Sequence, residues 1–195
     1  IEAQAPQASG KIYRLLSIGV SREGSDGRPS ASLLVVDGSG SLYTLIVKND
    51  AYNKISELAT DAIISCKARH ISSSTLICDD LSLAEEGDLP SSESFFKRIR
   101  DLGGVDSPVF VRVIALSKAN IQEITTRDGE VVKKGEVVVG DESGEARLVA
   151  WRDRVTLLED ISPGQRLVLK AVKPRVDWDG SPTLQIKTYS SIEKI

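Results

Sequence analysis

Two stretches of the sequence, VVVGDESGEARLVAWRD at Val137–Asp153 and LLVVDGSGSLYTLIVKND at Leu33–Asp50, follow one pattern. Each contains an aliphatic run, an acidic residue, a Ser-Gly pair and a second apolar run that ends in a polar cluster. When the two stretches are aligned, their turns match at three positions: Asp37 with Asp141, Ser39 with Ser143 and Gly40 with Gly144. This agreement indicates that one module occurs twice in the chain.

The two halves also match beyond the turn, in the alternation of apolar residues along their predicted strands. Every second residue of a strand points to the same face, and the alignment gives both halves the same inward positions in successive strands. The inward pairs are Leu42 with Ala146, Thr44 with Leu148, Ile46 with Ala150, Ile64 with Leu167, Cys66 with Leu169 and Ala68 with Ala171. A last block that begins at Thr75 aligns with one that begins at Thr183. The sequence therefore predicts a duplicated domain built from strands.

Short strands separated by turn signals such as DG and SPG are typical of a small all-β barrel. Five strands with a helical connection between the third and the fourth are the OB-fold arrangement, a Greek-key barrel. We predict an all-β protein of two five-stranded OB-fold barrels, joined by an acidic linker and a short helix. The predicted ranges are a flexible tail at 1–10, the first barrel at 11–86, the linker and helix at 87–106, and the second barrel at 107–195. Strands of the second barrel are expected at 108–117, 136–140, 145–151, 166–173 and 183–189, and those of the first near Ile12, Ala31, Ser41, Ala62 and Thr75.

The segment between the halves is acidic. Residues 79–93 carry six carboxylates and no base, which predicts a solvated linker. In the next stretch, SSESFFKRIRDLGG at 91–104, a short helix would place Phe95, Phe96 and Ile99 on one side. We expect Phe95 and Phe96 to fix one barrel against the other, and the alternative is an exposed helix that binds a partner.

Composition narrows the classes of function. The chain has 195 residues, 41% of them hydrophobic, and a net charge of -3, and no apolar run is long enough to cross a bilayer. It begins at Ile1 and contains no Met, so we expect that it was trimmed from a longer protein. Cys66 and Cys78 lack the spacing of zinc or redox motifs, and His70, the single histidine, is expected to be a partly exposed residue at a strand end. We therefore predict no metal, no cofactor and no enzymatic activity.

The outward positions of the second half combine cations with aromatic rings. Alternation turns Trp151 and Arg147 outward on one predicted strand and Phe110 and Arg112 outward on another. Three further residues are expected outward on the last two strands: Lys170, Val172 and Lys187. The loop RVDWDGSP adds Trp178, which lies close in sequence to Lys173 and Arg175. Cations that follow phosphates and a ring that stacks on a base are what binding of single-stranded nucleic acid requires.

Other interpretations of the two tryptophans remain open. Trp151 would close the barrel core if the alternation were shifted, and Trp178 would pack its loop instead of stacking on a base. From Val105 onward 14 basic and 14 acidic residues cancel, so binding would depend on a local stripe and have a modest salt dependence.

The segment from Pro108 to Lys194 resembles the OB-fold of archaeal single-stranded-DNA-binding proteins of the replication protein A class, through VGDESG, the strand that ends in Trp151, PGQ and the closing strand. The resemblance implies sequence-tolerant binding of single-stranded DNA in replication, recombination and repair, with Trp151 at the place of a base-stacking tryptophan. The family often has a second aromatic where this chain has Val172, and Trp178 is the nearest candidate for a third. The resemblance also implies a cytoplasmic, nucleoid-associated protein. The alternatives are an RNA- or tRNA-binding OB protein, since the same fold binds RNA, and a scaffold subunit whose barrels bind proteins.

The first barrel is expected to differ. The alignment puts Val47 at the place of Trp151 and turns Tyr43, Leu45 and Val47 outward, which gives a more apolar face. Such a face favours a protein contact, either self-association or binding of replication protein A-like subunits. Lys67 and Arg69, with Tyr43 and Tyr52 nearby, leave weak DNA binding as an alternative. Cys66 and Cys78 fall on inward positions of neighbouring strands, as two buried thiols or as a disulfide if the source is a thermophile.

Overall fold

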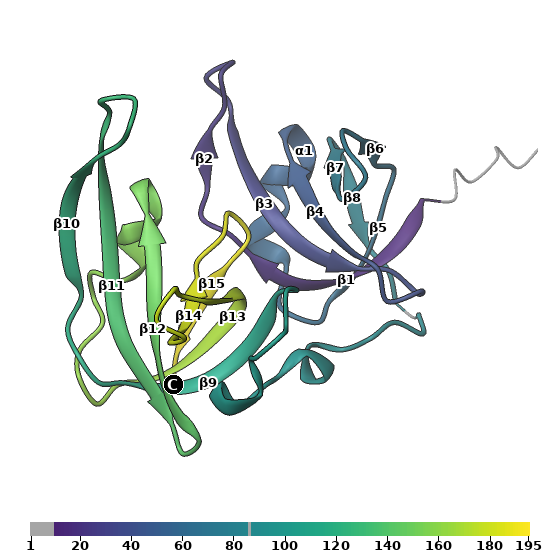
Figure 1. Cartoon of the computed structure of the whole chain (residues 1–195). Coiled ribbons are helices and arrows are strands. Elements are labelled where there is room, and N and C mark those ends of the chain that lie inside the picture. The colour runs from purple at the N-terminus through teal and green to yellow at the C-terminus, as the bar shows by residue number, and fades with distance from the viewer. Residues whose placement is uncertain (1–9, 86) are drawn as a thin grey trace, which may run out of the picture.

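The computed structural model describes residues 10–85 and 87–195, and it consists mainly of strands in two sheets. The first sheet forms from β1 to β8 and the second from β9 to β15, and each curls around its own hydrophobic core (Figure 1). The tail predicted at 1–10 lies outside the described residues except for Gly10, and so does Glu86 of the predicted linker. The all-β prediction with two OB-fold barrels is confirmed.

The first barrel has five main strands: β1 (Lys11–Ile18), β3 (Pro29–Val36), β4 (Leu42–Val47), β5 (Ile63–Cys66) and β7 (Thr75–Cys78). Strand β1 pairs with β3 and β5, β3 pairs with β4, and β4 runs parallel to β7. The short strand β6 (Arg69–His70) joins the end of β5 to β7, and His70 is exposed there as expected. Helix α1 (Asn49–Asn53) and the 3-10 helix η1 (Ile55–Glu57) connect β4 to β5.

The second barrel closes completely. Its main strands are β9 (Val109–Ala115), β11 (Val131–Asp141), β12 (Gly144–Trp151), β13 (Arg166–Val176) and β14 (Pro182–Gln185). Because β9 pairs with both β11 and β13, and β14 pairs with both β12 and β13, the five strands form a ring. The 3-10 helix η4 (Arg152–Leu157) stands between the third and fourth strands, as the OB-fold requires.

Each barrel carries elements that the sequence did not predict. Strand β8 (Leu81–Leu83) pairs with β5, and β15 (Ser191–Lys194) pairs with β13 in the equivalent place. Strand β8 uses part of the acidic stretch, so that stretch is not all solvated linker. In addition, β2 (Arg22–Glu23) extends β3 into a hairpin, and β10 (Asn120–Thr125) does the same for β11 (Figure 1).

One extra residue in the first turn reverses the predicted faces of β4. The carboxylate of Asp37 accepts hydrogen bonds from the N–H groups of Ser39 and Ser41, whereas that of Asp141 accepts them from Ser143 and Gly144. The first turn is thus one residue longer, and a shift of one residue turns every side chain of a strand to the other face. The predicted outward residues Leu45 and Val47 are fully buried in the core of the first barrel, and Tyr43 packs against that core. The prediction that these three residues form a partner-binding face is therefore wrong.

A β-bulge in β13 changes the faces of the second barrel. The pairing of β13 with β9 skips between Leu169 and Val172, and Ala171 has a positive φ of 57°. Beyond the bulge the alternation is reversed. Val172, which was predicted to face outward, is fully buried in the barrel core. The same reversal turns Lys173 outward, so this face presents a lysine where the prediction placed an aliphatic residue.

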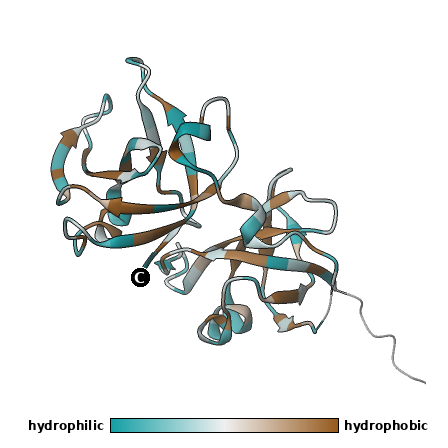
Figure 2. Ribbon diagram, turned by 90° about the horizontal axis from the view of Figure 1, so that it is seen from below, coloured by the Kyte–Doolittle hydropathy of each residue, from teal (hydrophilic) through white to brown (hydrophobic). Residues whose placement is uncertain are grey.

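A third apolar cluster joins the two barrels. Leu16, Leu34 and Val36 of the first barrel meet Phe110 and Ala171 of the second, and all five are buried. Figure 2 shows the hydrophobic stretches of strands from both barrels approaching each other at this junction. The prediction that Phe110 lies on an open binding face is wrong, because its side chain is only 2% exposed. We call this junction the seam.

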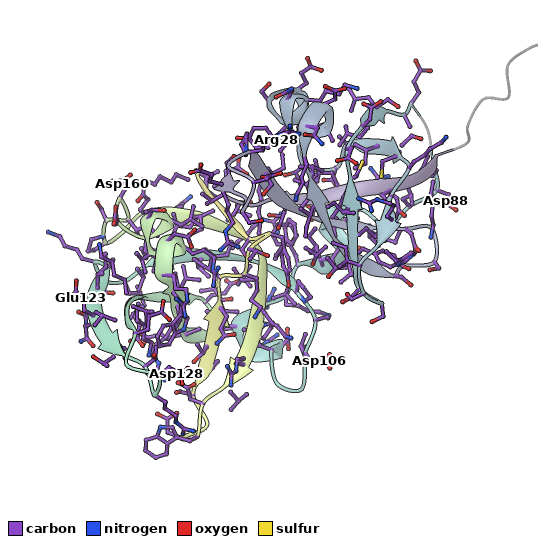
Figure 3. The ribbon with its side chains drawn as sticks, turned by 90° about the horizontal axis from the view of Figure 1, so that it is seen from above. Arg28, Asp88, Asp106, Glu123, Asp128 and Asp160 are labelled. Atoms are coloured by element: carbon purple, nitrogen blue, oxygen red, sulfur yellow. The ribbon has the colours of Figure 1, made fainter. Side chains whose placement is uncertain are left out.

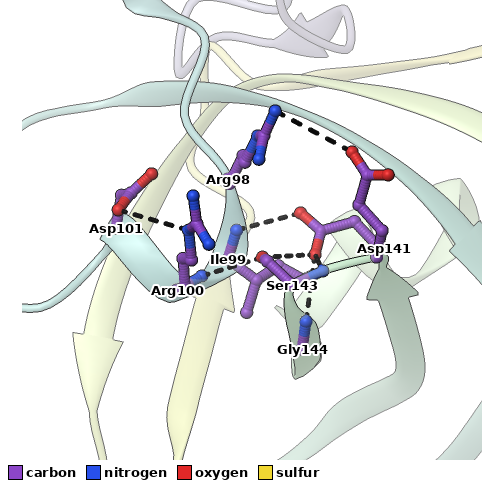
Figure 4. A network of polar contacts seen from close by, with 8 residues as sticks. Arg98, Ile99, Arg100, Asp101, Asp141, Ser143 and Gly144 are labelled. Atoms are coloured by element: carbon purple, nitrogen blue, oxygen red, sulfur yellow. Dashed lines mark hydrogen bonds and ion pairs between the residues drawn. The ribbon is translucent and has the colours of Figure 1, made fainter.

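The linker packs along the seam instead of forming one helix. It has two 3-10 helices, η2 (Ser92–Phe95) and η3 (Ile99–Asp101). Phe95 and Phe96 pack against the seam cluster, which agrees with their predicted role in fixing the barrels and not with that of an exposed partner site. The carboxylate of Asp141 accepts a hydrogen bond of 2.9 Å from the N–H of Ile99, and so the turn of the second barrel holds η3 in place (Figure 4).

Candidate nucleic-acid interface

Four adjacent strands of the second barrel, β11, β12, β14 and β13, share one outward face. Their register places Val149 beside Gln185 and Gln185 beside Lys173, on the side away from the barrel core, where Val149 is buried and the other two are partly exposed. Two residues away on each strand, Arg147 lies beside Thr183 and Thr183 lies beside Arg175. The structure thus brings together five of the predicted residues: Trp151, Arg147, Lys187, Lys173 and Arg175. We call this surface the groove face.

Trp151 lies at the end of β12 with its ring partly exposed. It pairs across the sheet with Lys134 of β11, whose Nζ lies 5.2 Å from the centre of the ring. On the other side, the N–H of Ile186 donates to the carbonyl of Val149 and completes the last pair of β12 with β14, and Lys187 follows in the turn beyond β14. The alternative that Trp151 closes the core does not hold, because the core residues of this strand are Ala146, Leu148 and Ala150. An aromatic ring with a lysine beside it is therefore available on the groove face.

Four cations of the second barrel lie near enough to repel one another. Burial lowers the pKa of Lys187, and repulsion from Lys173, Arg154 and Arg175 lowers it further. These four side chains come from η4, from β13 and from the end of β14. Such repulsion between like charges is relieved when an anion binds. Although the chain as a whole is acidic, this cluster forms a local positive site.

The loop between β13 and β14 forms a hairpin at the edge of the groove face. Arg147 forms an ion pair with Asp177, and its guanidinium also donates to the hydroxyl of Ser181 at 3.2 Å. Both partners belong to this hairpin, so Arg147 holds the loop against β12. Trp178, between Asp177 and Asp179, is 98% exposed. The alternative in which Trp178 packs its own loop is therefore excluded by the geometry.

Two of the predicted cations lie away from the groove face, near the seam. The guanidinium of Arg112 stacks on the ring of Phe96 at 3.7 Å and pairs with Glu93 at 3.0 Å. Lys170 pairs with Glu193 at 2.9 Å and donates to Thr60 of the first barrel at 3.0 Å. Because β9 and this part of β13 face the first barrel, their outward residues contact the seam and its surroundings.

The sequence interpretation missed Lys134 and Arg154. Lys134 was placed in a loop because β11 was predicted to begin only at Glu136, and pairing with β12 in fact starts earlier. Arg154 lies in η4, where no alternation marks a face, and burial lowers its pKa. The run WRDR, which begins at the last residue of β12, was the available signal, since it places bases on both sides of Asp153.

The equivalent face of the first barrel has different chemistry. Leu45 pairs with Leu76 as Leu148 pairs with Leu184. Three residues further along each strand, Lys48 replaces Trp151 and Asp79 replaces Lys187. The side chain of Asp79 accepts a hydrogen bond of 2.9 Å from Asn49. This face therefore has neither the ring nor the cation cluster of its partner.

Among residues 10–85 and 87–195, no group of three or more His, Cys, Asp or Glu side chains is arranged to hold a metal ion. Within the same residues, no helix has the length and apolar character needed to span a membrane. Cys66 and Cys78 are both buried, as expected, and their thiols are free. Figure 3 shows the acidic residues Asp106, Glu123, Asp128 and Asp160 spread around the outside of the second barrel.

Comparisons with known proteins agree with this architecture. The chain is 30% identical over 90 residues to Replication factor A of Methanothermobacter thermautotrophicus, a match that covers 46% of this chain and 11% of that protein. Among solved structures, a replication protein A heterotrimer bound to single-stranded DNA has a TM-score of 0.62 at 21% identity, covering 100% of this chain and 51% of the other. The HINb domain of p204 has a TM-score of 0.58 at 15% identity, over 95% and 96% of the two chains. No model of a known protein family matches the chain.

The class that these findings define is a protein of two OB-fold barrels in tandem. Within that class the chain is similar, over 90 residues, to the archaeal replication factor. The chain spans about a ninth of the length of that curated relative.

Proposed function

We propose that this chain binds single-stranded DNA on the groove face of the second barrel, with little preference for sequence. The observation that supports this most directly is the partly exposed ring of Trp151 beside Lys134, on the barrel that also carries the mutually repelling cations. A flat ring stacks on any base, and the cations neutralise the phosphates on either side. Trp178, at the rim, supplies a second ring for a neighbouring base.

The comparisons support the same proposal. Replication factor A and the replication protein A heterotrimer are similar to this chain, and the heterotrimer is described as bound to single-stranded DNA. We infer a role in protecting exposed strands during replication, recombination and repair. We further propose that this role is non-enzymatic, that it involves subunits like those of replication protein A, and that the domains follow the predicted ranges, with the second barrel at 107–195.

The proposal is tested by titrating a labelled thymidine oligomer with the protein and recording fluorescence anisotropy. Trp151→Leu keeps apolar bulk but removes the ring, whereas Trp151→Phe keeps a ring of smaller area. We expect the leucine variant to lose about 1 to 3 kcal/mol of binding free energy, the range for one stacked base, and the phenylalanine variant to lose less. Equal affinity of both variants and the unchanged chain would contradict stacking on Trp151.

Two further measurements separate the alternatives. If Lys173, Lys187, Arg154 and Arg175 neutralise about four phosphates, log K should fall with log salt with a slope of about -3. Parallel titrations with a ribose oligomer and a DNA duplex test the choice of nucleic acid. Tighter binding of the ribose oligomer would favour RNA recognition through the 2′-hydroxyl, and tighter binding of duplex would exclude base stacking as the basis of affinity.

A further inference from the structure

The hairpin formed by β2 and β3 extends from the first barrel to the second. Its strands pair through Arg22 with Ser30, and the N–H of Gly24 donates to the carbonyl of Arg28 to close the tip. Figure 1 shows the hairpin extending beyond the sheet on the side that faces the second barrel. At that side, Nε of Arg22 lies 3.6 Å from the carboxylate of Asp153. This ion pair joins the first barrel to the segment that directly follows Trp151.

The surroundings of Asp153 place Arg22 at the edge of the groove face. Asp153 lies between Arg152, which pairs with Glu130 at 2.7 Å, and Arg154, a member of the cation cluster. Arg22 and Arg152 repel Arg154 and add to the effect of burial, which lowers the pKa of Arg154. Arg22 therefore extends the positive surface of the second barrel with a side chain from the first.

We propose that Arg22 binds a backbone phosphate of the same DNA strand that occupies the groove face of the second barrel. This inference rests on the proposed function. It assigns the first barrel a direct part in binding, through its hairpin and not through its own equivalent face. That face carries Asp79 where the second barrel has Lys187, and Lys48 where it has Trp151, so it lacks both the ring and Lys187 of the cation cluster.

The Arg22–Asp153 pair is suited to an exchange of partners. The side chains are 43% and 57% exposed, and exposed pairs of this kind are weak because water screens them. A guanidinium forms two parallel hydrogen bonds with a phosphate, a stronger and more directional interaction. When a strand leaves the cation cluster toward the first barrel, Arg22 can therefore turn from Asp153 to the phosphate.

Neutralising each partner of the ion pair in turn provides the test. If Arg22 binds phosphate, Arg22→Ala weakens binding of a thymidine oligomer of about 12 nucleotides, whereas Asp153→Asn strengthens it, because it removes the competing carboxylate. Arg22→Ala should also reduce the salt slope by about 0.7, which is the contribution of one phosphate. When the salt concentration is raised fourfold, Arg22→Ala should therefore lose about 2.5-fold less affinity than the unchanged chain loses.

Arg28→Ala is the matched control, since Arg28 belongs to the same hairpin but its guanidinium donates to Asn49 of the first barrel. Weaker binding by both Arg22→Ala and Asp153→Asn would overturn the proposal, because the pair would then only orient the barrels. Equal slopes for Arg22→Ala and Arg28→Ala would overturn it as well. If Trp151→Leu weakens binding while Arg22→Ala does not, this inference fails alone. If Trp151→Leu has no effect, the proposed function fails.

Discussion

Gly19 lies where the two barrels meet, and we predict that replacing it with alanine forces them apart. A Cβ atom added to Gly19 would lie 1.8 Å from the carbonyl oxygen of Thr188, in the second barrel, and 2.9 Å from that of Ser32. Real Cβ atoms do not approach closer than 3.0 Å, so Gly19→Ala must move the barrels apart by at least about 1.2 Å (3.0 − 1.8). Both obstacles are backbone atoms, which cannot rotate away as a side chain does.

Such a displacement weakens the packing of the seam. Dispersion contacts lose a quarter to a half of their energy when a gap of 0.5 to 1 Å opens, and overpacking in a well-packed interior costs about 1 to 3 kcal/mol. We therefore expect Gly19→Ala to destabilise the protein by about 1 to 3 kcal/mol. Because the seam connects two separate cores, we also expect urea unfolding to split from one transition into two.

The assay is urea unfolding followed by tryptophan fluorescence and by circular dichroism. Both tryptophans belong to the second barrel, so fluorescence reports on that barrel while circular dichroism reports on both. Gly103→Ala is the control, since a Cβ at Gly103 meets no atom within 4 Å. If Gly19→Ala unfolds at the same urea concentration as Gly103→Ala, with coincident transitions by both probes, then the barrels are not held at this seam.

Two other predictions concern the turns. Burial opposes the charge of Asp37, but hydrogen bonds from Ser39, Lys11 and Ser41 outweigh it and lower its pKa to about 2. The charged carboxylate therefore contributes about 2 kcal/mol of stability above pH 4, and this is lost as the pH falls toward 2. In Asp37→Asn the stability of the first barrel should therefore fall less steeply between pH 4 and pH 2. The same loss of stability over this range in the variant and the unchanged chain would contradict the prediction. Arg147→Ala should lower stability by less than about 1 kcal/mol, since its ion pair is partly exposed, yet increase the mobility of Trp178. The steady-state anisotropy of Trp178, measured with Trp151→Phe present, should fall in this variant and not in Arg152→Ala.

The sequence was sufficient to predict the architecture because the period-2 pattern repeats through successive strands of both halves. It was insufficient wherever a single residue changes the register. The longer turn at Asp37 reversed the predicted faces of β4, and the bulge at Ala171 reversed those of β13. Neither change alters the composition of a strand, so each was invisible until the pairing of neighbouring strands was known.

The seam explains why the outward aromatic Phe110 was misassigned. An apolar residue that faces away from its own barrel has the same alternation whether it is open to ligand or covered by another domain. Phe110 is covered by Leu16 and Leu34 of the first barrel, residues that likewise face away from their own core. Whether such a face is covered or open depends on how the two barrels are positioned. That position depends on contacts between residues distant in sequence.

The two barrels therefore use the same fold for different purposes. In the second, the seam forms on β9 and at the bulge of β13, and Trp151 at the end of β12 stays partly exposed. In the first, the positions of Trp151 and Lys187 are taken by Lys48 and Asp79, while its outward apolar residues form the seam. If Arg22 completes the groove face as proposed, the seam also acts in binding, since it determines how far that arginine lies from the strand. A variant that opens the seam, such as Gly19→Ala, should then reduce the salt slope of DNA binding to that of Arg22→Ala, without changing the loss caused by Trp151→Leu.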